Sequence, residues 1–306
     1  MNRKIRKIMI IAAATLLAVS LFMVIRQLID YYMGDKVYSE AMEIAGIQPM
    51  ETESAVSTES ETKAETEEEP ETEEPEIEIE TESETEIESE TEPETETETE
   101  TETEAETEPV PQISFEEMIS SVNLDALRVY NNDVVGWIAV PYSALSYPIV
   151  QGDDNDYYLN HTWNKKLNSV GAIFMEHLVS PDFTDFNTII YGHRMGNGTM
   201  FNSLAYYSNY FYWQSNPYIY IVTDESIRRY DIYATYEASV DSITYALGIT
   251  ESDDKQEFIK HTLDSSVINT GIVPTEDDLI LTLSTCTRSG STSTRWVVHA
   301  ILNTEE

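Results

Sequence analysis

The fold follows from two short apolar segments near the C-terminus, Leu279-Ile280-Leu281-Thr282-Leu283-Ser284-Thr285-Cys286 and Arg295-Trp296-Val297-Val298-His299-Ala300-Ile301-Leu302. Each is typical of a β-strand, because apolar and β-branched residues dominate it, and a short polar loop separates the two. If the strands pair as neighbours, the end of the first meets the start of the second. This pairing would bring Cys286 close to Arg295.

Cys286 is the only cysteine in the 306 residues, so it cannot form an internal disulfide. It could be an inert buried thiol, a crosslink between chains or a nucleophile. A guanidinium at Arg295 would favour the thiolate and could donate hydrogen bonds to a carbonyl oxygen that becomes an oxyanion. An exposed arginine at the start of a strand is the alternative interpretation of Arg295. Arg288 competes for the same role, but it falls within the loop and is a poorer anchor.

A cysteine nucleophile also needs a proton-transfer partner, most often a histidine. The chain has five histidines, His161, His177, His193, His261 and His299. His261 falls on a predicted helix, and His299 lies within the last strand, about 13 Å along from Arg295. His193 differs because it ends an apolar strand and enters a glycine-rich turn, which presents a side chain at a rim. We therefore expect His193 to act with the cysteine.

The N-terminus predicts a membrane anchor. A basic segment, residues 1–7, precedes an uncharged and mostly apolar run over residues 8–25. That run is long enough to approach the span of a bilayer and longer than the apolar core of a typical signal peptide. Basic residues before the run predict a cytoplasmic N-terminus, a single pass through the lipid bilayer of the cell membrane and an extracellular domain beyond it. A cleaved signal peptide is the alternative.

An acidic segment follows the predicted juxtamembrane residues 26–50. Residues 51–110 hold 28 Glu and one Lys, and Thr is the commonest of the other residues. Such a segment has few apolar residues to bury and repels itself, so we expect it to be disordered and extended. It could hold the following domain away from the membrane, or it could be a solvated spacer without a specific partner. The acidity argues against nucleic acid as a partner, because nucleic-acid binding needs Lys and Arg.

Residues 111–306 have the size of one domain. Helices are predicted from a capping box at Ser114 and Glu117, over 124–129, and over 253–263 in a long connection. Strands are predicted over 135–140, 146–150, 171–175, 187–191, 218–222 and 228–236, before the two C-terminal strands. Many short strands with few helices favour an antiparallel β-barrel. No His, Asp and Glu cluster has the spacing of metal ligands, so no metal or other cofactor is expected.

The C-terminal segments also resemble a known family. Thr282-Leu283-Ser284-Thr285-Cys286, with Arg295 opening the next strand, resembles the Thr-Leu-x-Thr-Cys…Arg signature of sortases, the membrane-anchored cysteine transpeptidases of Gram-positive bacteria. Tyr191-Gly192-His193 is similar to their catalytic-histidine segment. The N-terminal helices, residues 134–138, residues 151–159 and a helix before the cysteine strand are similar to class B. The resemblance spans about residues 115–302.

The resemblance implies a closed sortase-type β-barrel that is mainly β, with N-terminal helices and a helix inserted before the cysteine strand. It also implies the reaction. Cys286 would attack the carbonyl after the threonine of an Asn-Pro-x-Thr-type sorting signal on a secreted protein, Arg295 would stabilise the oxyanion, and His193 would protonate the leaving amine. An amine of a peptidoglycan precursor would then resolve the thioester. By the same resemblance, the substrate-binding residues are Ser284, Thr285, Asn155, Leu159, Tyr191 and Tyr245.

Three other functions remain open at this stage. The same chemistry could polymerise pilins, with a protein lysine as the acceptor. The protein could be a surface cysteine peptidase that only hydrolyses its substrates. It could also be a non-catalytic surface binding module with an unreactive thiol.

Overall fold

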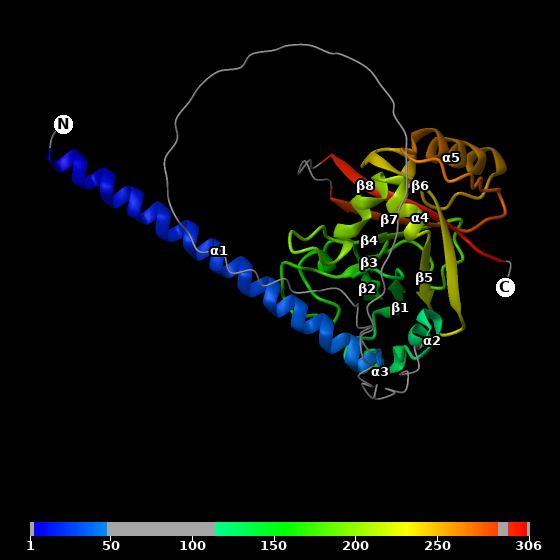
Figure 1. Ribbon diagram of the computed structural model, residues 1–306, viewed down its shortest axis with the longest axis horizontal. Helices are drawn as coiled ribbons and strands as arrows, with labels where there is room; N and C mark the ends of the chain where they lie inside the picture. Colours follow the sequence, from blue (N-terminus) through cyan, green and yellow to red (C-terminus); the bar gives the residue numbers. More distant parts are fainter. Residues whose placement is uncertain (1–2, 48–113, 287–292, 305–306) are drawn as a thin grey trace, which may run out of the picture. The chain divides into compact units, whose positions relative to one another are not determined.

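The computed structural model describes residues 3–47, 114–286 and 293–304 (Figure 1). The predicted acidic segment, residues 51–110, lies outside the described residues. Arg288, the alternative to Arg295, lies outside them as well.

Eight strands close into a barrel in the order β1-β2-β3-β4-β7-β8-β6-β5 (Figure 1). The strands are β1 (Val134–Ala139), β2 (Ser146–Val150), β3 (Ile173–Met175), β4 (Asn187–Tyr191), β5 (Tyr218–Val222), β6 (Ile227–Ser239), β7 (Ile280–Cys286) and β8 (Thr294–Leu302). The expected closed barrel is confirmed. The expectation of a purely antiparallel sheet is wrong, because β2–β3 and β4–β7 pair in parallel. Long connections with their own helical turns separate both parallel pairs in the chain, as parallel pairing requires.

Five α-helices and three 3₁₀ turns accompany the described part of the barrel. They are α1 (Arg3–Ala45), α2 (Phe115–Ser120), α3 (Leu124–Arg128), α4 (Tyr210–Ser215) and α5 (Ser252–Ser265), with η1 (Tyr157–Leu159), η2 (Phe201–Ser208) and η3 (Ile243–Tyr245). The capping box is confirmed, since Ser114 Oγ accepts from the Glu117 N–H at 3.1 Å and Glu117 Oε2 accepts from the Ser114 N–H at 2.8 Å. Helix α5 lies in the connection between β6 and β7, as expected. The sequence did not indicate η2 and α4.

The sheet is buried on both faces around β6, β7 and β8. Leu281 and Leu283 belong to the core inside the barrel, whereas Ile280 packs with Phe258 of α5 in a second apolar cluster. The Phe258 ring meets the Phe186 ring edge-on at 5.7 Å. Helix α5 therefore covers the outer side of the strands that carry the candidate catalytic residues.

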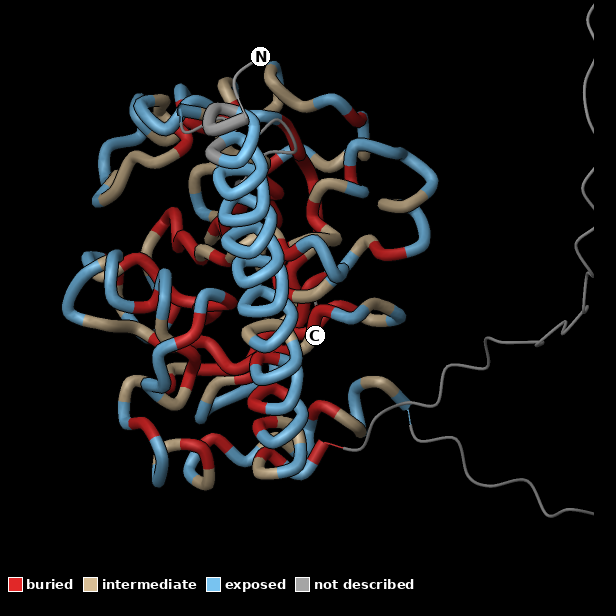
Figure 2. The backbone as a smooth tube through the Cα atoms, turned by 90° about the vertical axis from the view of Figure 1, so that its left-hand side faces the viewer, coloured by how far each residue is buried: buried red, intermediate tan, exposed pale blue. Residues whose placement is uncertain are grey.

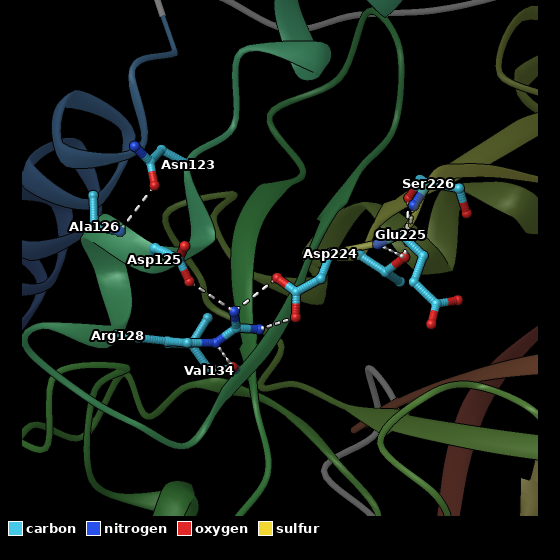
Figure 3. Close-up of polar contacts among 9 residues, drawn as sticks. Asn123, Asp125, Ala126, Arg128, Val134, Asp224, Glu225 and Ser226 are labelled. Carbon is cyan, nitrogen blue, oxygen red and sulfur yellow. Dashed lines mark hydrogen bonds and ion pairs between the residues drawn. The ribbon is translucent and has the colours of Figure 1, made fainter.

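An arginine fork fixes α3 to the turn between β5 and β6 (Figure 3). Arg128 Nη1 and Nη2 donate to the two carboxylate oxygens of Asp224 at 2.7 and 2.9 Å, and Arg128 Nε donates to the Val134 carbonyl at 2.9 Å. A bidentate pair of this kind is specific in geometry as well as favourable in energy. It joins the N-terminal helices to the barrel at the start of β1.

Helix α1 runs without interruption from the predicted anchor into the domain core. Its apolar N-terminal window has a mean hydropathy of 2.3 with no part buried, so by length and composition it could cross a membrane. Figure 2 shows α1 exposed along most of its length, and its buried residues begin at Gly34. Val37, Tyr38 and Ala41 belong to the main core, and Trp163 Nε1 donates to the Val37 carbonyl at 3.2 Å. The predicted juxtamembrane segment is therefore the second half of one helix and part of the domain.

The end of α1, before the acidic segment, is hydrogen-bonded to residues 121–123, which follow that segment. The Asn123 N–H donates to the Ala45 carbonyl at 3.0 Å, and Ser121 Oγ donates to the Gly46 carbonyl at 3.2 Å. The chain thus leaves the domain after Ile47 and returns to it at Ser114. Residues 48–113 are inserted between α1 and α2, after the residues that pack on the barrel, and not between the predicted anchor and the domain.

This arrangement predicts that residues 48–113 can be replaced by about ten Gly and Ser residues without loss of the fold. The closure entropy of a loop grows slowly with its length, so the shorter loop is expected to raise the free energy of unfolding by about 1–2 kcal/mol. Denaturant unfolding of the full chain and of the replaced chain would measure the change. A replaced chain that no longer folds would contradict the inserted-loop interpretation.

Candidate active site

Cys286 ends β7, and Arg295 is the second residue of β8. The two strands pair antiparallel, with the Cα atom of Cys286 opposite that of Arg295. Two residues earlier in β7, Ser284 pairs with Val297. The neighbouring strands expected from the sequence are therefore confirmed, and their register brings the backbones of the two residues together.

His193 leaves the strand on the other side of β7. Strands β4 and β7 are parallel, with Tyr191 opposite Ser284, and the Gly192 N–H donates to the Ser284 carbonyl at 3.2 Å. His193 lies two residues beyond Tyr191, and Cys286 lies two residues beyond Ser284. Because neighbouring strands are about 4.8 Å apart, both residues reach the same edge of the barrel at matching positions. The three predicted catalytic residues thus meet at one end of β4, β7 and β8.

A backbone carbonyl hydrogen-bonds to the imidazole of His193. His193 Nε2 lies 2.6 Å from the Leu159 carbonyl oxygen, so this nitrogen carries a proton and donates it. Gly171 lies against the same ring with φ +63°, and a Cβ atom there would be 2.9 Å from His193 Cδ2. Any larger residue at this position would displace the ring. Leu159, a predicted substrate-binding residue, therefore contacts the histidine through its backbone, while its side chain is 41% exposed.

Two predicted substrate-binding residues contact each other above β7. Tyr245 of η3 and Ser284 have their hydroxyl oxygens 2.9 Å apart. Ser284 is buried, and Tyr245 is half-buried. The connection between β6 and β7 thus covers the strand two residues before the cysteine.

Thr285 lies apart from this group. Side chains alternate between the two faces of a strand, so Thr285 shares the inner face with Leu281 and Leu283 of the main core, whereas Ser284 is on the outer face. Thr285 is 2% exposed. Thr285 and Ser284 therefore lie on opposite faces of β7, and the predicted role of Thr285 in substrate binding stays a prediction.

A buried carboxylate that the sequence analysis did not single out joins two other predicted residues. Glu176 is 5% exposed, and its Oε2 accepts from Asn155 Nδ2 at 2.6 Å and from the Tyr191 hydroxyl at 2.9 Å. Its Oε1 accepts from the Leu178 N–H at 3.3 Å. His177 Nδ1 lies 2.8 Å from the same oxygen but is not aligned for a hydrogen bond. An acid directly after the buried strand β3 was the signal that could have revealed it.

This carboxylate also fixes the orientation of Asn155. Asn155 Oδ1 accepts from the His177 N–H at 3.1 Å, while its Nδ2 donates to Glu176. Burial and the charge of Glu176 raise the pKa of the Tyr191 hydroxyl, so it remains a hydrogen-bond donor. The segment before η1 and the end of β4 are thereby joined on the side of the barrel that carries His193.

A second buried polar chain centres on His299. Its Nδ1 lies 2.9 Å from Thr282 Oγ1, and its Nε2 lies 3.1 Å from the Tyr236 hydroxyl. Tyr236 continues to Thr244 Oγ1 at 2.9 Å, and Asn187 Nδ2 donates to the Thr244 carbonyl at 3.3 Å. These bonds connect η3, directly or through one another, to the four strands β4, β6, β7 and β8. Burial lowers the pKa of His299 to about 3, so it is neutral near pH 7 and is unsuited to exchange protons there.

The comparisons with known proteins agree with this geometry. The family model of the sortase domain matches residues 138–303, more than half of the chain. The chain belongs to the sortase family. Sortase B of Listeria monocytogenes is 32% identical over 160 residues, and Sortase B of Staphylococcus aureus is 30% identical over 174 residues. The matched regions cover 52% and 57% of this chain, and 65% and 71% of the two relatives. The chain thus spans slightly less than two thirds of the Listeria protein.

Solved sortase structures show the same fold. A Staphylococcus aureus sortase B–substrate complex aligns with a TM-score of 0.56 and 30% identity, over 60% of this chain and 85% of that one. Clostridium perfringens sortase B aligns with a TM-score of 0.56 and 28% identity, over 59% of this chain and 100% of that one. The expected sortase-type barrel and the resemblance to class B sortases are confirmed.

The low pKa of His299 predicts how the stability of this sortase depends on pH. Below its ordinary pKa of 6.5 the unfolded chain binds a proton at His299, whereas the folded chain does so only near pH 3. Protons therefore favour unfolding, and the free energy of unfolding is expected to fall by about 2 kcal/mol between pH 7 and pH 5. Urea unfolding at the two pH values would measure the fall. In His299→Gln the fall should disappear, and its persistence there would exclude His299 as the cause.

The Glu176 contacts predict a loss of stability and activity in Glu176→Gln. The side-chain NH₂ group of Gln would face either the Leu178 N–H or the Asn155 and Tyr191 donors, so donor would meet donor. A buried polar group without a hydrogen-bond partner costs about 1–3 kcal/mol. Urea unfolding and peptide turnover would measure both effects. The matched control is Glu225→Gln, an exposed carboxylate near Arg228, which should behave as the wild type. Equal behaviour of the two variants would contradict the assignment.

Proposed function

We propose that this protein is a membrane-anchored cysteine transpeptidase that cleaves a C-terminal sorting signal after its threonine and transfers the protein to an amine. The observation that carries the proposal is the register of β4, β7 and β8, which sets Cys286 opposite Arg295 and beside β4, the strand that His193 follows two residues after its end. A nucleophile, an oxyanion donor and a proton carrier on three neighbouring strands form the minimum set for acyl transfer through cysteine.

The first half-reaction forms a thioester. The thiolate of Cys286 attacks the threonine carbonyl carbon, and a C–S bond forms as the carbonyl oxygen becomes an oxyanion that Arg295 stabilises. The C–N bond of the scissile peptide then breaks, and the leaving amine takes its proton from His193. The hydrogen bond from His193 Nε2 to the Leu159 carbonyl supports this step, because it fixes the orientation of the ring.

The second half-reaction reverses the proton flow. An amine of a peptidoglycan precursor attacks the thioester carbonyl, a new C–N bond forms, and the C–S bond breaks to restore Cys286. His193 accepts the proton that the attacking amine loses. Amines attack thioesters readily, so transfer can compete with hydrolysis when the amine is held in place.

The substrate is a secreted protein with an Asn-Pro-x-Thr-type signal, bound as an extended peptide. Two groups of predicted substrate-binding residues border the candidate site. One is the hydrogen-bonded pair Ser284 and Tyr245. The other is Asn155 and Tyr191, which both donate hydrogen bonds to Glu176. The solved Staphylococcus aureus sortase B is a complex with its substrate, which supports a substrate-binding site on this fold. The apolar N-terminal window of α1 supports a single membrane pass over residues 8–25, with the catalytic domain outside the cell.

The proposal predicts ligation by the full-length chain in detergent micelles. Signal peptides of the Asn-Pro-x-Thr type, supplied with oligoglycine or diaminopimelate-type amines, should give a product joined at threonine, read by mass spectrometry. Cys286→Ala should abolish it, and His193→Ala and Arg295→Ala should each lower kcat about a hundred-fold or more. Arg228→Ala is the matched control, since Arg228 donates to the Asp182 carbonyl and lies ten residues along β6 from the partner of Arg295.

The same assay separates the alternatives. Cleavage without ligation across the range of amines would identify a peptidase and overturn the transpeptidase proposal. Ligation only to lysine side chains of a folded protein would indicate pilin polymerisation. Turnover that survives in Cys286→Ala would exclude the cysteine mechanism altogether.

A further inference from the structure

The segment that leads to Gly171, the residue that lies against the His193 ring, packs against helix α1, far away in the sequence. Asp30, Gly34 and Tyr38 of α1 recur at intervals of four residues, so they share one face of the helix. Ser169 Oγ donates to Asp30 Oδ2 at 2.9 Å, and a Cβ atom on Gly34 would be 2.7 Å from Val170 Cγ2. This face of α1 is therefore in close contact with the segment that leads to Gly171.

Tyr38 supports His193 through Gly171. The Tyr38 hydroxyl is buried and donates to the Gly171 carbonyl at 2.5 Å. Gly171 lies directly against the imidazole, with room for no Cβ atom between its Cα atom and His193 Cδ2 or the Leu159 carbonyl. The position of the Gly171 backbone thus sets both the space for the ring and the place of the carbonyl that accepts its Nε2 proton.

Tyr38 also supports the turn from its other end. Its ring meets the Tyr147 ring edge-on at 5.2 Å and 89°, and the Tyr147 hydroxyl accepts from the Met200 N–H at 3.0 Å. Met200 closes the turn after His193 by an isolated bridge to Arg194, with a left-handed φ of 57°. A non-glycine residue in that conformation needs surrounding contacts to hold it there.

We propose that Tyr38 is a positioning residue for His193, and that the second half of α1 is part of the active site as well as of the anchor. The inference rests on the proposed function, because it names what holds its proton carrier in place. Tyr38 lies thirteen residues beyond the predicted end of the membrane span, which is about 20 Å along an α-helix. The same helix would therefore fix the orientation of the histidine and the distance of the catalytic site from the bilayer.

The test compares Tyr38→Phe with Tyr233→Phe in the full-length chain in detergent micelles. Both variants remove one buried tyrosine hydroxyl, and that of Tyr233 meets Thr262 Oγ1 at 3.0 Å beneath α5. Tyr38→Phe should lower kcat about ten-fold with little change in KM, and should shift the histidine limb of the pH–rate profile. Tyr233→Phe should lower the melting temperature to a similar extent but keep kcat and the pH profile.

A second variant and a second readout make the test independent of turnover. Gly34→Ala should push α1 away from Val170 and change kcat in the same direction as Tyr38→Phe. NMR titration of labelled histidines, with His193 assigned through His193→Ala, should show an altered His193 pKa or ring shift in both α1 variants and none in Tyr233→Phe.

The outcomes are distinct. Unchanged His193 signals and an unchanged pH profile in both α1 variants would overturn the role of Tyr38, whatever the melting temperatures. Turnover that survives in Cys286→Ala would overturn the proposed function instead, while the NMR comparison would still decide whether α1 positions His193.

Discussion

The parallel pairing of β4 with β7 is the constraint on which the rest of the site depends. It sets Tyr191 opposite Ser284, and the antiparallel pairing of β7 with β8 then sets Cys286 opposite Arg295. Side chains alternate along a strand, so a slip of one residue would turn Ser284 into the barrel and Thr285 out of it. Apolar residues at 281 and 283 prevent this slip, because they must remain inside. The hydrophobic pattern of β7 therefore determines that Ser284 is on the outer face, where it meets Tyr245.

Buried polar groups on the outer face add specificity to that register. His299, Thr282, Tyr236, Asn187 and Thr244 are all buried and bonded to one another, which limits η3 to one position over the sheet. A buried network is favourable only when its members find partners, so a shifted η3 would leave several unpaired. We infer that the network holds the residue that follows Thr244, Tyr245, over Ser284.

The sequence predicted what depends on local pattern and failed where distant segments meet. Strand periodicity located all eight strands to within a few residues, and the cysteine, arginine and histidine stood out by their places at strand ends. The parallel pairs could not be read from the pattern, because period two is the same in both directions. The family motif gave Ser284 and Thr285 the same predicted role, although they lie on opposite faces of β7, because a motif names positions without the faces of the strand. Glu176 was missed because its partners, Asn155 and Tyr191, come from separate segments.

The packing of helix α1 also depends on distant segments and could not be predicted from the local sequence. Composition predicted an anchor over residues 8–25 and a juxtamembrane segment over residues 26–50. It did not predict packing on the barrel, because Val37, Tyr38 and Ala41 are too few to indicate a core-facing side of the helix by themselves. They are part of the core because of contacts with Trp163 and Gly171, which are more than a hundred residues away in the sequence. Because α1 continues as one helix from its apolar window into these contacts, movement of the domain relative to the bilayer would require bending the helix or breaking its contacts with the barrel. The acidic segment comes after those contacts in the chain, so it would not lie between the proposed membrane span and the barrel. If the apolar window crosses the membrane as proposed, α1 would therefore constrain the orientation and distance of the catalytic edge.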